Sequence, residues 1–154
     1  MNITLSLAEL IKKGGVYTGI EGSTPPEVYK NLSEVITLPS YISKNEFIDA
    51  LCQRELVLST AVGNGIAMPH PQTRVIKDTD DEKIIVCYLK RPIDMNAPDG
   101  MRVFVMFVLM TSNVQTHLQI ISALAKSLHR PEVKKALEHE AGIEELIKII
   151  EDKE

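Results

Sequence analysis

Two stretches in the middle of the sequence carry apolar side chains at almost every position. They are Lys83–Leu89, which is apolar after its lysine, and Val103–Met110, which is apolar throughout. Runs of this length are typical of strands, and the lack of alternation with polar residues predicts strands that are covered on both faces. We therefore expect the two strands to form the middle of a sheet that has helices on each side.

The same runs limit where the protein can reside. The longest, Val103–Met110, is far shorter than the roughly 18 residues that a membrane-spanning helix needs. No basic flank precedes an apolar stretch at the N-terminus, so both secretion and membrane insertion are disfavoured. Two cysteines, Cys52 and Cys87, are too few for a disulfide scaffold and indicate a cytoplasmic protein.

Length and charge limit the number of domains and the class of function. A chain of 154 residues, with 44% hydrophobic and 25% charged residues, predicts one globular domain over 1–154. Its formal net charge of −4 argues against a general nucleic-acid binder, because such affinity comes from Lys and Arg side chains that neutralise phosphates.

Three helices are expected before the strands. The first has apolar residues at helical spacing that stop at glycines, the second begins at a hydroxyl residue followed by prolines, and the third begins with a capping-box pair. The first helix carries Leu5 to Ile11 and stops at Gly14 and Gly15. The second begins at Ser23 or Thr24, carries Val35 and Ile36 and ends before Pro39. The third begins with Ser43 and Glu46 and runs to Arg54 or Glu55.

The segment after the third helix changes character. Leu56–Val62 and Ile66–Met68 look extended and flank a Gly-Asn-Gly turn sequence, which predicts a pair of strands with a short turn. Arg91–Pro92 and Ala97–Gly100 mark a surface loop between the two apolar strands.

Helical patterns return in the last third of the chain. We expect helices from about Val114 to Leu128, from Pro131 to near Ala141, and over Ile143–Ile150. The apolar set of the first of these is Val114, Leu118, Ile121, Leu124, Ala125 and Leu128. Helices, then strands, then helices predict an α/β fold with a mixed sheet flanked by helices on both faces.

A histidine between two prolines is the most constrained polar residue. Pro69 ends a predicted strand, and Pro71 biases the backbone of His70 toward an extended conformation. A histidine held in this way loses little conformational entropy when a partner docks. The alternative interpretation is a surface turn in which a histidine happens to lie.

His117 and Arg54 are the other candidates. His117 falls in the first turn of its helix, where the dipole favours a neutral imidazole and a bound anion; the alternative interpretation is an exposed residue without a role. Arg54 falls near the end of its helix, where a cation is favourable whatever its function. His129 and His139 lie near the polar ends of late helices, and we assign them no role.

These residue types are compatible with phosphoryl transfer. A neutral imidazole can attack phosphorus, while an arginine and a helix N-terminus neutralise the phosphoryl oxygens. The sequence lacks the histidine spacing of zinc hydrolases, the serine elbow of esterases and the glycine-rich loops that bind nucleotides. We therefore expect neither a metal nor a cofactor.

Spaced residues across this region resemble the active-site signature of the fructose/mannitol-type IIA domains of the bacterial phosphoenolpyruvate:sugar phosphotransferase system, including their nitrogen-regulatory relatives. The matching positions are Glu55, Val62, Gly63, Ile66, Ala67, Met68, Pro69 and His70. Arg54 falls where the family has an active-site arginine, and Thr116–Gln119 matches the segment with its second active-site histidine.

The resemblance covers about Ser43 to Leu137, and the loop with Pro92–Asp94 and Asp99–Gly100 is similar to that of the nitrogen-regulatory branch. It implies a mixed five-stranded sheet between helices. It also implies that His70 accepts a phosphoryl group from the phosphocarrier protein HPr and passes it to a cysteine of a IIB domain. In that role Arg54 and His117 would neutralise and orient the phosphoryl group.

Pro71 departs from the family pattern, which usually has a small residue after the histidine. Proline offers no N–H, so the phosphoryl oxygens would need other donors. Three hypotheses follow: a phosphocarrier, a protein that regulates partner proteins according to its phosphorylation state, and a scaffold whose His70 is inert.

Overall fold

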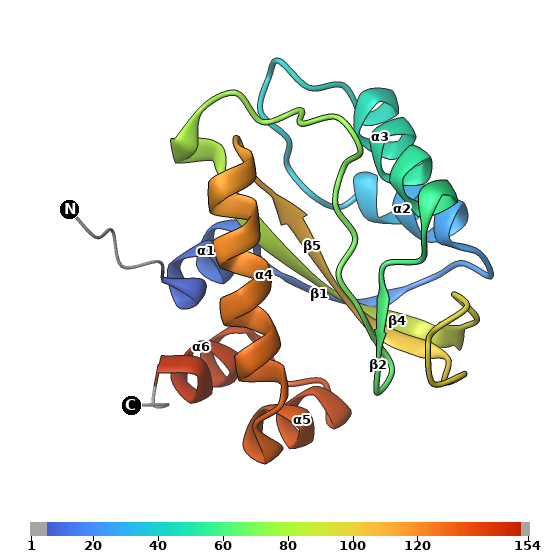
Figure 1. Ribbon diagram of the computed structural model, residues 1–154, viewed down its shortest axis with the longest axis vertical. Helices are drawn as coiled ribbons and strands as arrows, with labels where there is room; N and C mark the ends of the chain where they lie inside the picture. The colour runs from blue at the N-terminus through green and yellow to red at the C-terminus, as the bar shows by residue number, and fades with distance from the viewer. Residues whose placement is uncertain (1–5, 152–154) are drawn as a thin grey trace.

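The computed structural model describes residues 6–151, so Leu5 of the predicted first helix lies outside the described residues. A five-stranded sheet lies between two groups of helices (Figure 1). This arrangement confirms the predicted α/β fold. In chain order the elements are α1 (Leu7–Gly14), β1 (Val16–Ile20), α2 (Pro25–Ser33), α3 (Lys44–Val57), β2 (Ala61–Gly63), β3 (Ile66–Ala67), the 3-10 helix η1 (Thr79–Asp81), β4 (Lys83–Ile93), β5 (Val103–Met110), α4 (Val114–Leu128), α5 (Pro131–Glu138) and α6 (Ile143–Glu151).

The sheet is mixed, with the strand order β1-β4-β5-β3-β2. The central strands β4 and β5 are antiparallel, β1 and β3 add to them in parallel, and β2 closes the far edge as a hairpin with β3. Lys83 lies opposite Met110, so the start of β4 and the end of β5 share one end of the sheet. The two apolar runs therefore form the centre of the sheet, as predicted.

Side chains of the central strands alternate between two hydrophobic cores. Ile84, Val86 and Tyr88 of β4 pack with residues of α1, α4, α5 and α6. Ile85 and Cys87 point to the other face and pack with residues of α2 and α3. Because both faces are covered, an unbroken apolar run is the pattern that these strands require.

Strand β1 was not expected from the sequence. It has only five residues, includes Gly19 and lies at the edge of the sheet, where its middle residues are exposed. An exposed edge strand has no apolar run to reveal it. The β-branched and aromatic residues Val16, Tyr17 and Thr18, which follow two glycines, were the signal available.

Three predicted boundaries were wrong. Helix α2 ends at Ser33 rather than near Pro39, and Val35 is exposed. Helix α3 continues to Val57, so Leu56 is helical and not extended. Strand β4 runs on through Arg91 and Pro92, where the register with β5 is irregular; a proline without an N–H is tolerated at such a place.

The strongest helical signals were correct. Ser43 and Glu46 form the capping box of α3, each side chain accepting a hydrogen bond from the backbone of the other. Helix α4 has the predicted bounds, but Val114 and Leu118 of its expected apolar face are exposed. Within residues 6–151, no helix has the length and apolar character needed to cross a membrane.

Candidate functional site

The backbone around His70 is held on both sides. Strand β3 ends at Ala67, yet the chain continues along β5, where Leu109 N–H donates to the Pro69 carbonyl over 2.8 Å. After Pro71, the Gln72 N–H donates to the Ala50 carbonyl of α3 over 2.9 Å. These bonds and the two prolines place His70, half-buried, in the space between the sheet and α3.

Arg54 of α3 contacts the histidine directly. Its Nε donates to His70 Nε2 over 3.1 Å, and its Nη1 donates to the Leu58 carbonyl just beyond the helix end. The second bond fixes the guanidinium at the end of α3, where carbonyl groups without helical partners favour a cation. The sequence placed Arg54 at a helix end, and the structure adds its contact with His70.

His117 completes the cluster from α4, which packs against the opposite face of the sheet from α3. It lies in the first turn of α4, which begins where β5 ends, and its ring centroid is 4.4 Å from that of His70. Only 9% of the residue is exposed, so the interpretation of an exposed histidine is wrong. Its Nδ1 lies 3.5 Å from the Thr111 hydroxyl.

Hydrogen-bond partners determine the tautomer of His70. Its Nδ1 faces the Met68 carbonyl at 3.1 Å, and a carbonyl can only accept, so Nδ1 carries the proton. Its Nε2 faces the N–H of Arg54 and therefore presents a lone pair. A neutral ring with a lone pair on Nε2 is a nucleophile.

Burial favours the neutral form of both rings. It lowers the pKa of His117 to about 4, with further lowering by the nearby His70, Arg74 and Arg54. Burial also lowers the pKa of His70, although the Met68 carbonyl acts in the opposite direction. The first-turn position of His117 predicted a ring kept neutral by the helix dipole, whereas the larger cause in the structure is the loss of solvent.

Glu55 is a feature that sequence reasoning named only as part of the family signature. Its carboxylate accepts hydrogen bonds from the hydroxyl of Tyr29 and from both the backbone and the hydroxyl of Thr60. The available signal was an acidic residue directly after Arg54 in the last turn of a helix, where the dipole disfavours a negative charge.

The predicted loop between the central strands lies against the β2–β3 turn. Asp99 accepts hydrogen bonds from the N–H groups of Asn64 and Met101, and these lower the pKa of its carboxyl. Asn64 and Gly65 both have positive φ in this turn, as the Asn-Gly sequence predicts. The loop thus braces the hairpin that leads to His70.

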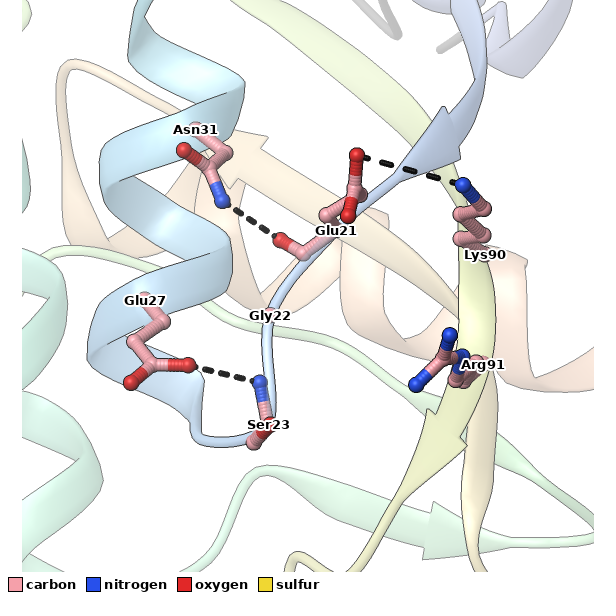
Figure 2. A pocket seen from close by; sticks show the side chains of 7 residues that line it. All are labelled: Glu21, Gly22, Ser23, Glu27, Asn31, Lys90 and Arg91. Carbon is pink, nitrogen blue, oxygen red and sulfur yellow. Dashed lines mark hydrogen bonds and ion pairs between the residues drawn. The ribbon is translucent and has the colours of Figure 1, made fainter.

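Other polar features lie apart from this cluster. His129 and His139 cap the C-terminal ends of α4 and α5, and His139 pairs with Glu145 at 2.7 Å. A polar pocket lies at the opposite end of β4, where Lys90 and Glu21 approach to 4.0 Å (Figure 2). Among residues 6–151, no three His, Cys, Asp or Glu side chains gather in a way that could hold a metal ion.

Comparison with known proteins gives one consistent result. Residues 9–153 match the family described as phosphoenolpyruvate-dependent sugar phosphotransferase system, EIIA 2. The nitrogen regulatory protein of Pseudomonas aeruginosa is 28% identical over 152 residues, which cover 96% of each chain. The nitrogen regulatory protein of Escherichia coli is also 28% identical, over 98% of this chain and 93% of its own.

Solved structures agree on the fold. The nitrogen regulatory protein IIA-Ntr of Neisseria meningitidis superposes with a TM-score of 0.76 at 22% identity, over 93% of this chain and 97% of its own. IIA mannitol of Escherichia coli superposes with a TM-score of 0.66 at 18% identity, over 90% of this chain and 96% of its own.

Proposed function

We propose a role for His70 from the premise that this chain belongs to the phosphoenolpyruvate-dependent sugar phosphotransferase system EIIA 2 family and is a phosphotransferase component of that system. In our proposal His70 accepts a phosphoryl group from an HPr-like donor and passes it to a cysteine of a IIB domain. The observation that carries this is the neutral His70 ring, whose Nε2 lone pair meets Arg54 at 3.1 Å and whose ring centroid lies 4.4 Å from that of His117.

The transfer step follows from these positions. The Nε2 lone pair forms the bond to phosphorus, while the bond from phosphorus to the donor breaks and its electron pair stays with the donor. The proton on Nδ1 remains in place and donates to the Met68 carbonyl, so no separate base is needed. Transfer to the next acceptor is the same step in reverse at His70.

Two neighbours would donate hydrogen bonds to the phosphoryl oxygens, and the guanidinium of Arg54 would also neutralise their charge. Arg54 leaves Nε2 and turns its guanidinium to the oxygens, a planar fork suited to phosphate. In our proposal the neutral His117 accepts the Thr111 hydroxyl proton at Nδ1, 3.5 Å away, and carries its own ring proton on Nε2, which donates to a phosphoryl oxygen. Pro71 adds no N–H, so this pair supplies the donors that a backbone amide would otherwise share.

Exposed apolar side chains around the site support docking of protein partners. We define the apolar rim as Leu56, Val57, Leu58, Val114 and Leu118, all of which are exposed. The first three follow Arg54 at the end of α3, and the last two flank His117 on α4. Water-exposed apolar residues grouped around polar reacting groups are typical of protein interfaces.

The partners in this proposal are an HPr-like donor and a IIB domain. IIA mannitol of Escherichia coli forms a complex with phosphorylated IIB mannitol, and its fold matches this chain with a TM-score of 0.66. We place the exchange in the cytoplasm, where Cys52 and Cys87, both free, stay reduced.

Intact mass spectrometry tests the proposal. Wild type incubated with enzyme I, HPr and phosphoenolpyruvate is expected to gain one acid-labile phosphoryl group, and His70→Ala is expected to gain none. If folded wild type stays unmodified, the carrier proposal fails and the hypothesis of an inert His70 gains support.

A second candidate function is regulation of a partner protein by phosphorylation state. The observation in its favour is the match to nitrogen regulatory proteins along almost the whole chain. Pull-downs with the phosphorylated protein and with His70→Ala would compare partners bound in the two states. Transfer to a IIB domain, with identical sets of bound proteins in both states, would count against a regulatory role.

A further inference from the structure

The carboxylate of Glu55 is held by three hydrogen bonds behind the candidate site. Oε1 accepts from the hydroxyl groups of Tyr29 and Thr60, each over 2.8 Å, and Oε2 accepts from the Thr60 N–H over 2.9 Å. Tyr29 is fully buried and Thr60 nearly so. Because a lost bond would leave a buried polar group unpaired, the three donors fix the position of the Thr60 backbone relative to α3.

The hydrogen bonds continue from Thr60 to the reacting ring. The Thr60 carbonyl accepts the N–H of Met68 over 2.9 Å, and the Met68 carbonyl faces His70 Nδ1 at 3.1 Å. An unbroken series of bonds therefore joins the buried Tyr29 on α2 to the ring that carries the nucleophile. The bonds to Glu55 orient the Thr60 carbonyl, and the bond to that carbonyl in turn orients the Met68 carbonyl.

Glu55 is also the neighbour of Arg54 in the sequence. Arg54 is the preceding residue of α3, and its Nε donates to the opposite nitrogen of the same ring. Fixing Glu55 at the end of α3 thus locates the acceptor that faces Nδ1 and the donor that faces Nε2.

From this series we propose that Glu55 is a positioning residue for phosphoryl transfer. It acts through Thr60 and Met68, whose carbonyl keeps the ring proton of His70 on Nδ1 and so leaves Nε2 as the nucleophile. The effect on transfer rests on the proposed function, whereas the effect on the ring tautomer does not. A purely structural Glu55 would join α3 to β2 and leave the ring unaffected.

Nitrogen-15 NMR of the imidazole ring tests the tautomer without any phosphoryl donor. In wild type we expect a protonated Nδ1 and a bare Nε2. Glu55→Ala frees the Thr60 backbone, so we expect a mixture of tautomers and a rate of phosphoryl acceptance roughly tenfold lower, since small misplacements of a nucleophile are costly.

Two further variants separate positioning from stability. Glu46→Ala removes the capping carboxylate at the other end of α3 and is expected to lower stability while leaving the ring tautomer and the transfer rate unchanged. Glu55→Gln retains an oxygen for the Thr60 N–H and can donate to the two hydroxyl oxygens, so it should keep the wild-type tautomer. Because the charge of Glu55 raises the pKa of His70, Glu55→Gln should lower that pKa further.

A folded Glu55→Ala protein with the wild-type ring tautomer would overturn the proposal, as would an altered tautomer in Glu46→Ala. If Glu55→Ala does not fold, Glu55→Gln decides: the wild-type tautomer supports the proposal, and a mixture of tautomers contradicts it. If wild type shows the expected tautomer but never accepts a phosphoryl group, the proposed function fails while the positioning of the ring stands.

Discussion

At the scale of single residues, the site depends on hydrogen bonds to a neutral ring. His70 has a donor at one nitrogen and an acceptor at the other, and both partners are fixed by the backbone nearby. Burial lowers the pKa of both histidines, so we expect the proposed nucleophile to stay neutral at neutral pH.

Arg54→Ala tests the role of the guanidinium. Loss of the charged donors that face the phosphoryl oxygens is expected to slow phosphoryl acceptance roughly 100-fold, as for other preorganised donors in transition-state sites. Arg54→Lys keeps the charge but not the planar guanidinium, so its rate should lie between the rates of wild type and Arg54→Ala. Rapid-quench measurement of phosphoprotein formation gives the rates, and an Arg54→Ala rate equal to wild type would remove Arg54 from the mechanism.

The buried His117 should make stability depend on pH. Its pKa of about 4 in the folded state lies below the unfolded value near 6.5, so the unfolded chain binds more protons between these values. The free energy of unfolding should therefore decrease as pH falls from about 6.5 toward 4. Urea unfolding at pH 7 and pH 5 should show a smaller decrease for His117→Gln than for wild type; equal decreases would contradict this.

At the scale of elements, close approach of backbones decides where some helices can lie. Gly14 ends α1 against β4, and a Cβ built there would lie 1.9 Å from the Ile84 carbonyl oxygen. The amphipathic α1 can reach the sheet at this point only because the residue has no side chain.

Gly14→Ala is expected to destabilise the protein by about 2–3 kcal/mol, because the new methyl group displaces α1 from β4. The matched control is Gly142→Ala, where the same methyl group would meet nothing within 4 Å and stability should stay close to wild type. Urea unfolding measures both, and similar free energies for the two variants would show that α1 can shift without loss.

Sequence signals predicted the elements that depend on local chemistry. The capping box of Ser43 and Glu46 and the helical spacing of Val114–Leu128 are properties of the segment itself, and both were correct. Strand β1 and the extension of β4 through Pro92 depend on which strand lies alongside, and the short run Val16–Thr18 was the one local signal for β1.

Some features of the candidate site could also be predicted from the sequence, and others could not. Rigidity at His70 could be inferred from its two prolines, and the helix positions of Arg54 and His117 from caps and spacing. Their convergence could not, because it depends on the parallel pairing of β3 and β5, which brings the ends of two strands and one helix together. Only the resemblance to a family joined the three residues beforehand. The bonds of Glu55 to Tyr29 and Thr60 likewise join separate elements.

At the scale of the whole molecule, His70 and His117 lie at one end of the sheet, because the Pro69 carbonyl accepts the N–H of Leu109 near the end of β5 and α4 begins just after that strand. The start of β4 lies at this end, and Lys90, near the other end of the strand, lines the pocket of Figure 2. The two histidines and the polar pocket are thus separated along β4.

Leu118→Glu tests the apolar rim. The side chain is 59% exposed, so the substitution should leave the melting temperature near the wild-type value. A charge placed beside His117 in a desolvated interface should raise the KM for the HPr donor by at least roughly tenfold, with a much smaller change in kcat. Lys90→Gln, which makes the same change in net charge at the opposite end of β4, should keep the wild-type KM; an equal rise in both variants would point to a general effect of charge.

If His70 is the phosphoryl acceptor that we propose, its bond to Arg54 should make the resting protein selective about what it reacts with. The guanidinium occupies the lone pair that has to attack, so a neutral electrophile that approaches the ring finds no free electron pair. An incoming phosphoryl group carries negative oxygens, which are stronger acceptors for a guanidinium than an imidazole is. In this proposal the negative oxygens draw the guanidinium away from Nε2, so the lone pair becomes free only when the group that arrives carries negative charge.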